Sequence, residues 1–144
     1  MGNRHQGRII AFQTLYRYGV TGEDLARLLD LSWLGVEKLE KLTPEVRAFA
    51  QLIVSGTIEN LTEIDAEISN SLEHWDISRV ARVDLANLRI SVFGLLYMAD
   101  IPASVTIDEA IEIARDFGTD DSYRFINGVL DGINKTQQKK QQKP

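Results

Sequence analysis

The sequence predicts an all-α fold, a compact helical bundle of five to seven helices that can form two packed three-helix halves. Only three of the 144 residues are proline, and no stretch alternates apolar and polar residues with a period of two. Apolar residues recur instead three and four positions apart, as on one face of a helix. Apolar residues make up 44% of the chain and charged residues 26%, which favours a folded core over disorder.

The first half of the chain predicts three helical stretches. The first covers residues 3–18, where apolar side chains share one face and Gly19 ends the pattern. A leucine-rich stretch over residues 22–42 predicts more helix, with a break near residues 32–35. Thr43-Pro44-Glu45 then combines a hydroxyl cap, a proline at the first helical position and an acid near the positive end of the helix dipole. The apolar spacing carries that helix to residue 75.

The next two helices are expected from their capping residues. Asp76 can cap a helix over residues 78–98, which Asp100-Ile101-Pro102 stops. Thr106 and Glu109 form a capping box, in which a hydroxyl at the cap is followed three residues later by an acid. The helix that follows this box is closed by Gly118.

The last helix is expected to open at Thr119 or Asp120. Gly128 and Gly132 share one of its faces, and a glycine inside a helix costs about 1 kcal/mol relative to alanine. We therefore expect a neighbouring helix backbone to approach that face closely. From residue 135 the chain has lysine and glutamine but no apolar anchor, so residues 1–134 are expected to form one domain and residues 135–144 a disordered basic tail.

Charge is unevenly distributed along the chain. The net charge is −5, yet residues 1–22 contain three arginines and no acid, and residues 132–144 contain four lysines and no acid. Basic ends on an acidic body can direct a polyanion to one side of a molecule, but they can also be solvated tails. Composition alone leaves both interpretations open.

Residue content excludes several kinds of chemistry. The chain has no cysteine, so disulfides, thiolate metal sites and iron–sulfur clusters are ruled out. The longest near-apolar run, residues 90–99, is shorter than the ~20 residues of a membrane span, and no secretory signal precedes it, so a soluble cytoplasmic protein is expected.

Neither His5 nor His74 has a ligand-like neighbour, and no nucleotide-binding or hydrolase motif occurs. A carboxylate stripe at Asp108, Glu112 and Asp116 could hold a metal, but without a partner histidine it favours a solvated helix face. No catalysis, cofactor or metal is expected.

The first helix has a different character. Gln6, Gln13 and Arg17 form one stripe, and further basic groups crowd the helix start. Arginine and glutamine pair with phosphates and base edges, and the aromatic rings of Phe12 and Tyr16 offer stacking faces. This combination indicates RNA binding, with a solvated helix as the alternative.

Two parts of the chain resemble the NusB family of transcription antitermination proteins. The opening N-R-H-Q-G-R, followed by A-F-Q-T-L-Y at residues 11–16, is similar to the family's amino-terminal signature. The carboxy-terminal half is more specific, with L-R-I at residues 88–90, I-P at 101–102, E-A at 109–110 and F-I-N-G-V-L-D at 125–131. The resemblance covers nearly the whole chain.

The resemblance implies two three-helix bundles packed at right angles and a protein without catalytic activity or cofactor. It implies binding to the boxA RNA of ribosomal RNA leader transcripts together with the ribosomal protein NusE, in a complex with other Nus factors and RNA polymerase. The helix over residues 78–98 would meet NusE, and the free protein could be a monomer or a homodimer. The RNA-binding residues implied by the resemblance are Arg4, His5, Gln6, Arg8, Gln13, Tyr16, Asp121, Arg124 and Phe125.

The sequence also departs from the family pattern. His5 and Gln6 stand where many relatives have arginine or lysine, which predicts fewer phosphate contacts and a weaker salt dependence. Phe93-Gly94 replaces a frequent Tyr-Glu pair on the partner-facing helix, and Ile9 replaces a frequent acid. Two alternatives remain: a protein–protein adaptor, or an RNA-binding module like that of a ribosomal RNA cytosine methyltransferase. Since the chain ends at Pro144 with no Rossmann-type domain, no catalysis is expected.

Overall fold

The computed structural model describes residues 2–73 and 75–142, and all regular structure within these ranges is helical, which confirms the predicted all-α fold. The amino-terminal half contains α1 (Asn3–Val20), α2 (Leu25–Leu29), the short 3₁₀ helix η1 (Ser32–Leu34), α3 (Val36–Lys41) and α4 (Pro44–Glu59). The carboxy-terminal half contains α5 (Leu61–Ser71), the 3₁₀ helix η2 (Ile77–Arg79), α6 (Arg82–Tyr97), α7 (Ala103–Phe117) and α8 (Ser122–Gln142).

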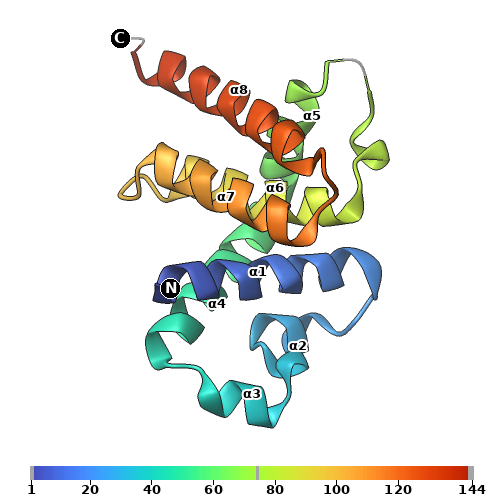
Figure 1. The fold of residues 1–144 in the computed structure, drawn as a ribbon, viewed down its shortest axis with the longest axis vertical. Helices are drawn as coiled ribbons and strands as arrows, with labels where there is room; N and C mark the ends of the chain where they lie inside the picture. Colours follow the sequence, from blue (N-terminus) through green and yellow to red (C-terminus); the bar gives the residue numbers. More distant parts are fainter. Residues whose placement is uncertain (1, 74, 143–144) are drawn as a thin grey trace.

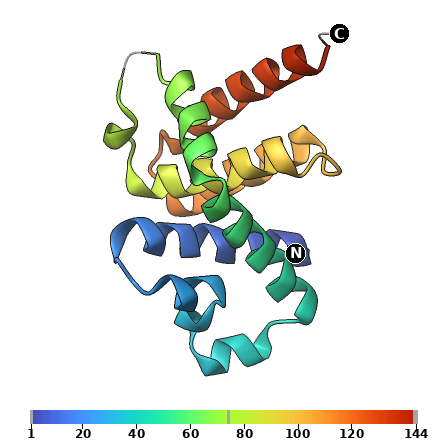
Figure 2. The same cartoon turned by 180° about the vertical axis from the view of Figure 1, so that it is seen from behind.

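The two halves pack on each other and share one core. α1 to α4 form the lower part of Figure 1 and α5 to α8 the upper part, while α4 leads directly into α5 and links the parts, as Figure 2 shows from behind. α6 is central, because it contacts α1 and α4 in the lower part and α5, α7 and α8 in the upper part. The buried cluster includes Phe12 and Val54 from one half and Leu88 and Ile126 from the other.

Helix α4 begins as predicted but ends early. The hydroxyl oxygen of Thr43 accepts a hydrogen bond from the backbone N–H of Val46 at 3.2 Å, which confirms the cap. The single helix predicted over residues 44–75 is two helices, because the backbone leaves helical geometry at Asn60. The Asn60 side chain donates to the carbonyl oxygen of Gly56 at 2.8 Å, and such local side-chain bonds compete with helix continuation.

The starts of α6 and α7 differ from the expected ones. Asp76 caps η2, where its carboxylate accepts from the Ser78 N–H at 2.9 Å, and α6 begins only at Arg82. The capping box predicted at Thr106 is wrong, because α7 begins at Ala103 and Thr106 lies buried inside it. Pro102 is the N-cap residue, and its carbonyl oxygen accepts from the N–H groups of Val105 and Thr106 at 3.0 and 3.3 Å, so the helix begins one turn earlier than the box suggests.

The close helix contact predicted at Gly128 and Gly132 is also wrong. A Cβ atom at either position would meet nothing within 4 Å. The close approach occurs instead at Gly56 in α4, where a Cβ would overlap the ring of Phe93 in α6. Gly56 therefore lets α4 and α6 approach closely, whereas the glycines of α8 face open space.

The structure continues α8 through residue 142, which corrects the expectation of a disordered tail for residues 135–142. Lys135 lies 3.0 Å from Asp131 one turn earlier, and Lys140 lies 3.6 Å from Glu67 on α5. An ion pair between residues four positions apart stabilises a helix, and the segment contains no glycine or proline to interrupt it. The rest of the predicted tail, residues 143–144, lies outside the described residues. None of the described helices has both the length and the hydropathy that a bilayer span requires.

Candidate nucleic-acid interface

The first four predicted RNA-binding residues, Arg4, His5, Gln6 and Arg8, form a basic arm at the start of α1. Their side chains divide into two groups. Arg4 and Gln6 are exposed, whereas His5 and Arg8 are only 8% and 7% exposed. Because α1 begins at Asn3, these four residues lie in the first two turns of one docked helix. Of the two exposed side chains, Gln6 faces solvent and Arg4 lies beside α4, whereas the two buried ones face α4 and α7.

His5 is bound to acidic residues of α7. Its Nδ1 atom lies 2.5 Å from Oε2 of Glu109 and 3.8 Å from Oε2 of Glu112. These three groups bring ligand atoms within 4.8 Å of one another, so their spacing could hold a metal ion. The guanidinium of Arg8 lies 3.9 Å from the other oxygen of Glu109, and its positive charge competes with a cation there. His74, the other histidine of the chain, lies outside the described residues.

Arg4 and Arg8 both lie against the ring of Phe49 on α4. Their guanidinium carbons are 5.5 Å and 5.2 Å from the ring centroid, within the range of cation–π attraction. Gly7 lets this ring approach, since a Cβ there would lie 2.8 Å from a ring carbon of Phe49. Burial lowers the pKa of Arg8 below its ordinary value, and the charge of Glu109 acts in the opposite direction. Arg8 therefore has a packing role in addition to its charge.

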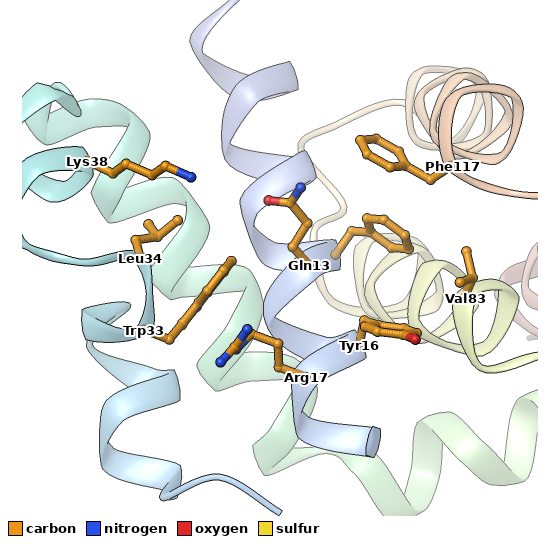
Figure 3. A pocket seen from close by; sticks show the side chains of 9 residues that line it. Gln13, Tyr16, Arg17, Trp33, Leu34, Lys38, Val83 and Phe117 are labelled. Atoms are coloured by element: carbon orange, nitrogen blue, oxygen red, sulfur yellow. The ribbon is translucent and has the colours of Figure 1, made fainter. Parts of the chain in front are cut away.

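Farther along α1, Gln13 and Tyr16 line an open groove of about 360 Å³ (Figure 3). Gln13 is half-buried, and Tyr16 remains 37% exposed. The groove extends across α1 from the η1–α3 segment to α6 and the end of α7. It is lined by Phe12, Gln13, Tyr16, Arg17, Trp33, Leu34, Lys38, Val83 and Phe117.

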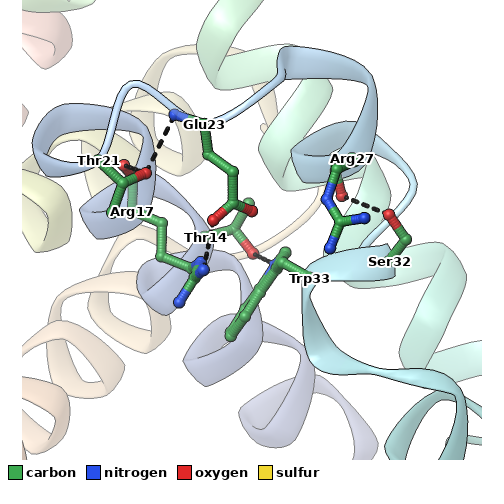
Figure 4. A network of polar contacts seen from close by, with 7 residues as sticks. All are labelled: Thr14, Arg17, Thr21, Glu23, Arg27, Ser32 and Trp33. Atoms are coloured by element: carbon green, nitrogen blue, oxygen red, sulfur yellow. Dashed lines mark hydrogen bonds and ion pairs between the residues drawn. The ribbon is translucent and has the colours of Figure 1, made fainter.

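A polar network fixes the η1 side of the groove (Figure 4). The indole N–H of Trp33 donates to the hydroxyl of Thr14 at 3.0 Å, and this hydroxyl donates to the carbonyl of Ile10 at 2.7 Å. Arg17 forms an ion pair with Glu23, and its guanidinium carbon lies 4.8 Å from the centroid of the Trp33 ring. These contacts fix the side chain of Arg17 and hold Trp33 of η1 against α1.

The third predicted group lies at the start of α8. Asp121 and Arg124 are exposed, and Arg124 donates from Nε to the hydroxyl of Tyr123 at 3.0 Å. Phe125 is half-buried against the ring of Trp75, with 5.3 Å between the ring centroids. This group thus contributes one acid, one cation and an aromatic pair to the surface.

The structure places two of the predicted RNA-binding residues in one groove. Gln13 and Tyr16 share the groove with Phe117, which is four residues before Asp121 in the chain. Trp33 and Lys38, which complete the groove from η1 and α3, are not among the residues predicted from the sequence. Helical periodicity describes one helix at a time, so it contains no signal for a surface built from η1, α3 and α1 together.

The side chains of α1 suit contacts with a nucleic acid. Helix α1 combines exposed cationic and amide side chains with aromatic rings and contains no acid. Cations and amides contact phosphates and base edges, and rings stack on unpaired bases. This is the composition expected of a single-stranded RNA surface.

Known proteins match the chain over most of its length. The model of the NusB family matches residues 5–135. A curated transcription antitermination protein NusB of Treponema denticola is 48% identical over 130 residues, which cover 90% of this chain and 94% of that protein.

Among solved structures, T. maritima NusB is 38% identical, with a TM-score of 0.81, over 92% of this chain and 90% of its own. A structure of the antitermination factors NusB and NusE in complex with double-stranded RNA matches with a TM-score of 0.83 over 94% of this chain and 98% of that chain. At 24% identity, this last likeness concerns the fold.

Proposed function

The chain belongs to the NusB family, and from this premise we propose that it is a transcription antitermination factor that binds the boxA RNA of ribosomal RNA leader transcripts together with NusE. The proposed complex also contains other Nus factors and RNA polymerase. The protein contributes binding rather than catalysis and needs no cofactor. Its work on nascent transcripts places it in the cytoplasm.

One structural observation carries the proposal beyond family membership. Helix α1 exposes Arg4, Gln6 and Tyr16, and its eighteen residues include no acid, although the whole chain has a net charge of −5. A polyanion is repelled by an acidic surface and attracted to a helix that has basic groups and no acid. The groove beside Tyr16 adds aromatic rings, which a surface for phosphates alone would not need.

The nine proposed RNA-side residues have unequal tasks. Four of them are accessible on α1 and contact RNA directly: Arg4, Gln6, Gln13 and Tyr16. Two more, Asp121 and Arg124, are accessible at the start of α8 and face the RNA there. His5, Arg8 and Phe125 are held by Glu109, Phe49 and Trp75, and they position the accessible residues. Residues 1–134 act as one RNA-binding domain.

Binding to NusE should strengthen binding to RNA. The accessible basic surface is small, and a few phosphate contacts give weak, salt-sensitive binding. A partner that adds its own RNA contacts raises the affinity through linkage, and RNA then raises the affinity for the partner by the same factor.

A gel-shift titration tests this function. Labelled boxA RNA is titrated with the protein, with NusE, and with an equimolar mixture, beside a scrambled RNA of the same length. We expect the mixture to bind boxA more tightly than either protein alone and to discriminate against the scrambled RNA. Equal affinity of the protein alone and the mixture would contradict the cooperative model. A protein that binds NusE in a pull-down but does not increase RNA binding over NusE alone would favour a protein–protein adaptor.

A further inference from the structure

We propose that the groove across α1 receives one unpaired nucleobase of the bound RNA, so that the RNA path extends onto the η1–α3 segment. This inference rests on the proposed RNA-binding function and adds a specific site to it. Trp33 and Lys38, which lie outside α1, become RNA-contacting residues.

The groove has two aromatic walls with polar groups between them. Figure 3 shows Trp33 on one side of α1 and Tyr16 with Phe117 on the other. Gln13 and Arg17 project from α1 into the space between the walls. A flat base needs ring faces or a guanidinium plane for stacking and an amide for its hydrogen-bonding edge, and the groove supplies each of these.

Arg17 is held in place before any RNA arrives. One contact is its ion pair with Glu23, and the other is its position over the Trp33 ring, 4.8 Å from the centroid. The indole is in turn fixed by the hydrogen bond to Thr14 at 3.0 Å. A stacking surface that is already ordered loses less conformational entropy on binding. The Trp33–Arg17 pair therefore forms a ready wall for a base.

The charge of Lys38 and the position of the groove favour a nucleobase over an apolar ligand. Lys38 is exposed at the rim, and Figure 3 shows its amine directed toward the groove. A cation at the rim can contact the phosphate of the nucleotide whose base lies inside. The groove also continues the proposed RNA surface, because Gln13 and Tyr16 belong to both.

Tryptophan fluorescence with intact protein tests the inference first. The chain contains two tryptophans, Trp33 and Trp75. The fluorescence of wild type, Trp33→Phe and Trp75→Phe is followed during titration with boxA RNA, with NusE added where the RNA requires it. We expect RNA to quench the Trp33 signal, so that quenching persists in Trp75→Phe. RNA that binds without changing the Trp33 signal would overturn the base site, while the proposed function would stand.

A set of boxA RNAs, each with one abasic nucleotide, then identifies the base. We expect one position to weaken binding about tenfold, consistent with the loss of a stacked base, and to abolish Trp33 quenching. Lys38→Ala should weaken binding, whereas Lys41→Ala, an exposed lysine of the same helix outside the groove, should not. If no abasic position removes the quenching, or if both lysine variants behave alike, the inference is wrong. If no RNA in the set binds at all, the proposed function itself fails.

Discussion

Nδ1 of His5, at the start of α1, lies 2.5 Å from Oε2 of Glu109, in the middle of α7. The contact joins residues 104 positions apart and ties the basic start of α1 to the carboxy-terminal half. Arg8, one turn after His5, approaches the other oxygen of the same carboxylate at 3.9 Å. Glu109 therefore anchors the two buried members of the predicted arm.

Glu109→Gln should lower stability, because it removes the charge that both His5 and Arg8 face. Hydrogen bonds to charged groups are worth somewhat more than neutral ones, and we expect a loss of about 1 kcal/mol, given the partial exposure of Glu109. Urea unfolding followed by circular dichroism measures it. Glu112→Gln is the matched control, since Glu112 is 3.8 Å from His5 and largely exposed. Equal losses in the two variants would show that Glu109 is not the anchor.

The two arginines of α1 should respond differently to truncation. Arg4→Ala removes an exposed cation, so RNA affinity should fall and the salt slope should decrease by about one, with an unchanged melting temperature. Arg8→Ala removes a buried side chain whose aliphatic part and guanidinium pack on Phe49. We therefore expect its melting temperature to fall in addition to its RNA affinity. Melting curves and RNA titrations at two salt concentrations separate these effects. An unchanged melting temperature for Arg8→Ala would argue against the packing role.

Two glycine-to-alanine variants should change the stability of the protein in opposite directions. Gly56→Ala places a methyl group in the ring of Phe93, and overpacking of this kind costs about 1–3 kcal/mol. Gly132→Ala adds a methyl group in open space on α8, where alanine is favoured by up to about 1 kcal/mol. Thermal melts of both proteins beside wild type give the comparison. Stabilisation by Gly56→Ala would mean that α4 and α6 are not in contact at this point.

Structural features that depend on a single segment could be predicted from the sequence. The Thr43 cap, the end of α7 at Gly118 and the helical content all depend on a residue and its near neighbours, and the structure confirms them. The break at Asn60 was missed, because the apolar pattern continues across it while a single side-chain hydrogen bond stops the helix.

Features that depend on two elements were not readable. Gly56 and Gly128 are alike in sequence terms, and only the position of Phe93 distinguishes a helix crossing from open space. Similarly, the sequence groups His5 with the other residues of the basic arm, and only the fold shows that it is buried against Glu109. The candidate site was therefore predictable along α1, whereas its continuation to Trp33 and Lys38 required the fold.

Asp84 in α6 should make stability depend on pH. Burial raises the pKa of this carboxyl above its ordinary value of 3.8, and a hydrogen bond with Ser122 partly opposes the shift. The folded protein then binds a proton more readily than the unfolded chain, so this group's contribution to stability falls as pH rises through the window above 3.8.

Asp84→Asn removes that titration. Relative to wild type, the variant should gain stability as pH rises from about 4 to 7, with the gain levelling off above the raised pKa. Urea unfolding at several pH values in this range measures the difference. A difference that stays constant, or that increases toward acid pH, would contradict the assignment.

Asp121 should restrain RNA binding. It is exposed at the start of α8, three residues before the exposed cation Arg124, and a carboxylate facing phosphates repels them. Asn keeps the shape and hydrogen-bonding capacity of the side chain without its charge. The hydroxyl of Ser122 already accepts from the Thr119 N–H at 2.9 Å, so the turn before α8 does not depend on the Asp121 charge.

We therefore expect Asp121→Asn to leave the melting temperature nearly unchanged and to tighten RNA binding by about 1 kcal/mol or less, because an exposed charge is screened by salt. Titrations of boxA RNA at low and high salt measure the gain, which should shrink at high salt. Asp120→Asn is the matched control, being an exposed neighbour outside the proposed RNA-side residues. If both variants tighten binding equally, the effect reflects net charge. If Asp121→Asn leaves binding at low salt unchanged, Asp121 lies away from the RNA, and if it weakens binding, the Asp121 carboxylate does not restrain it.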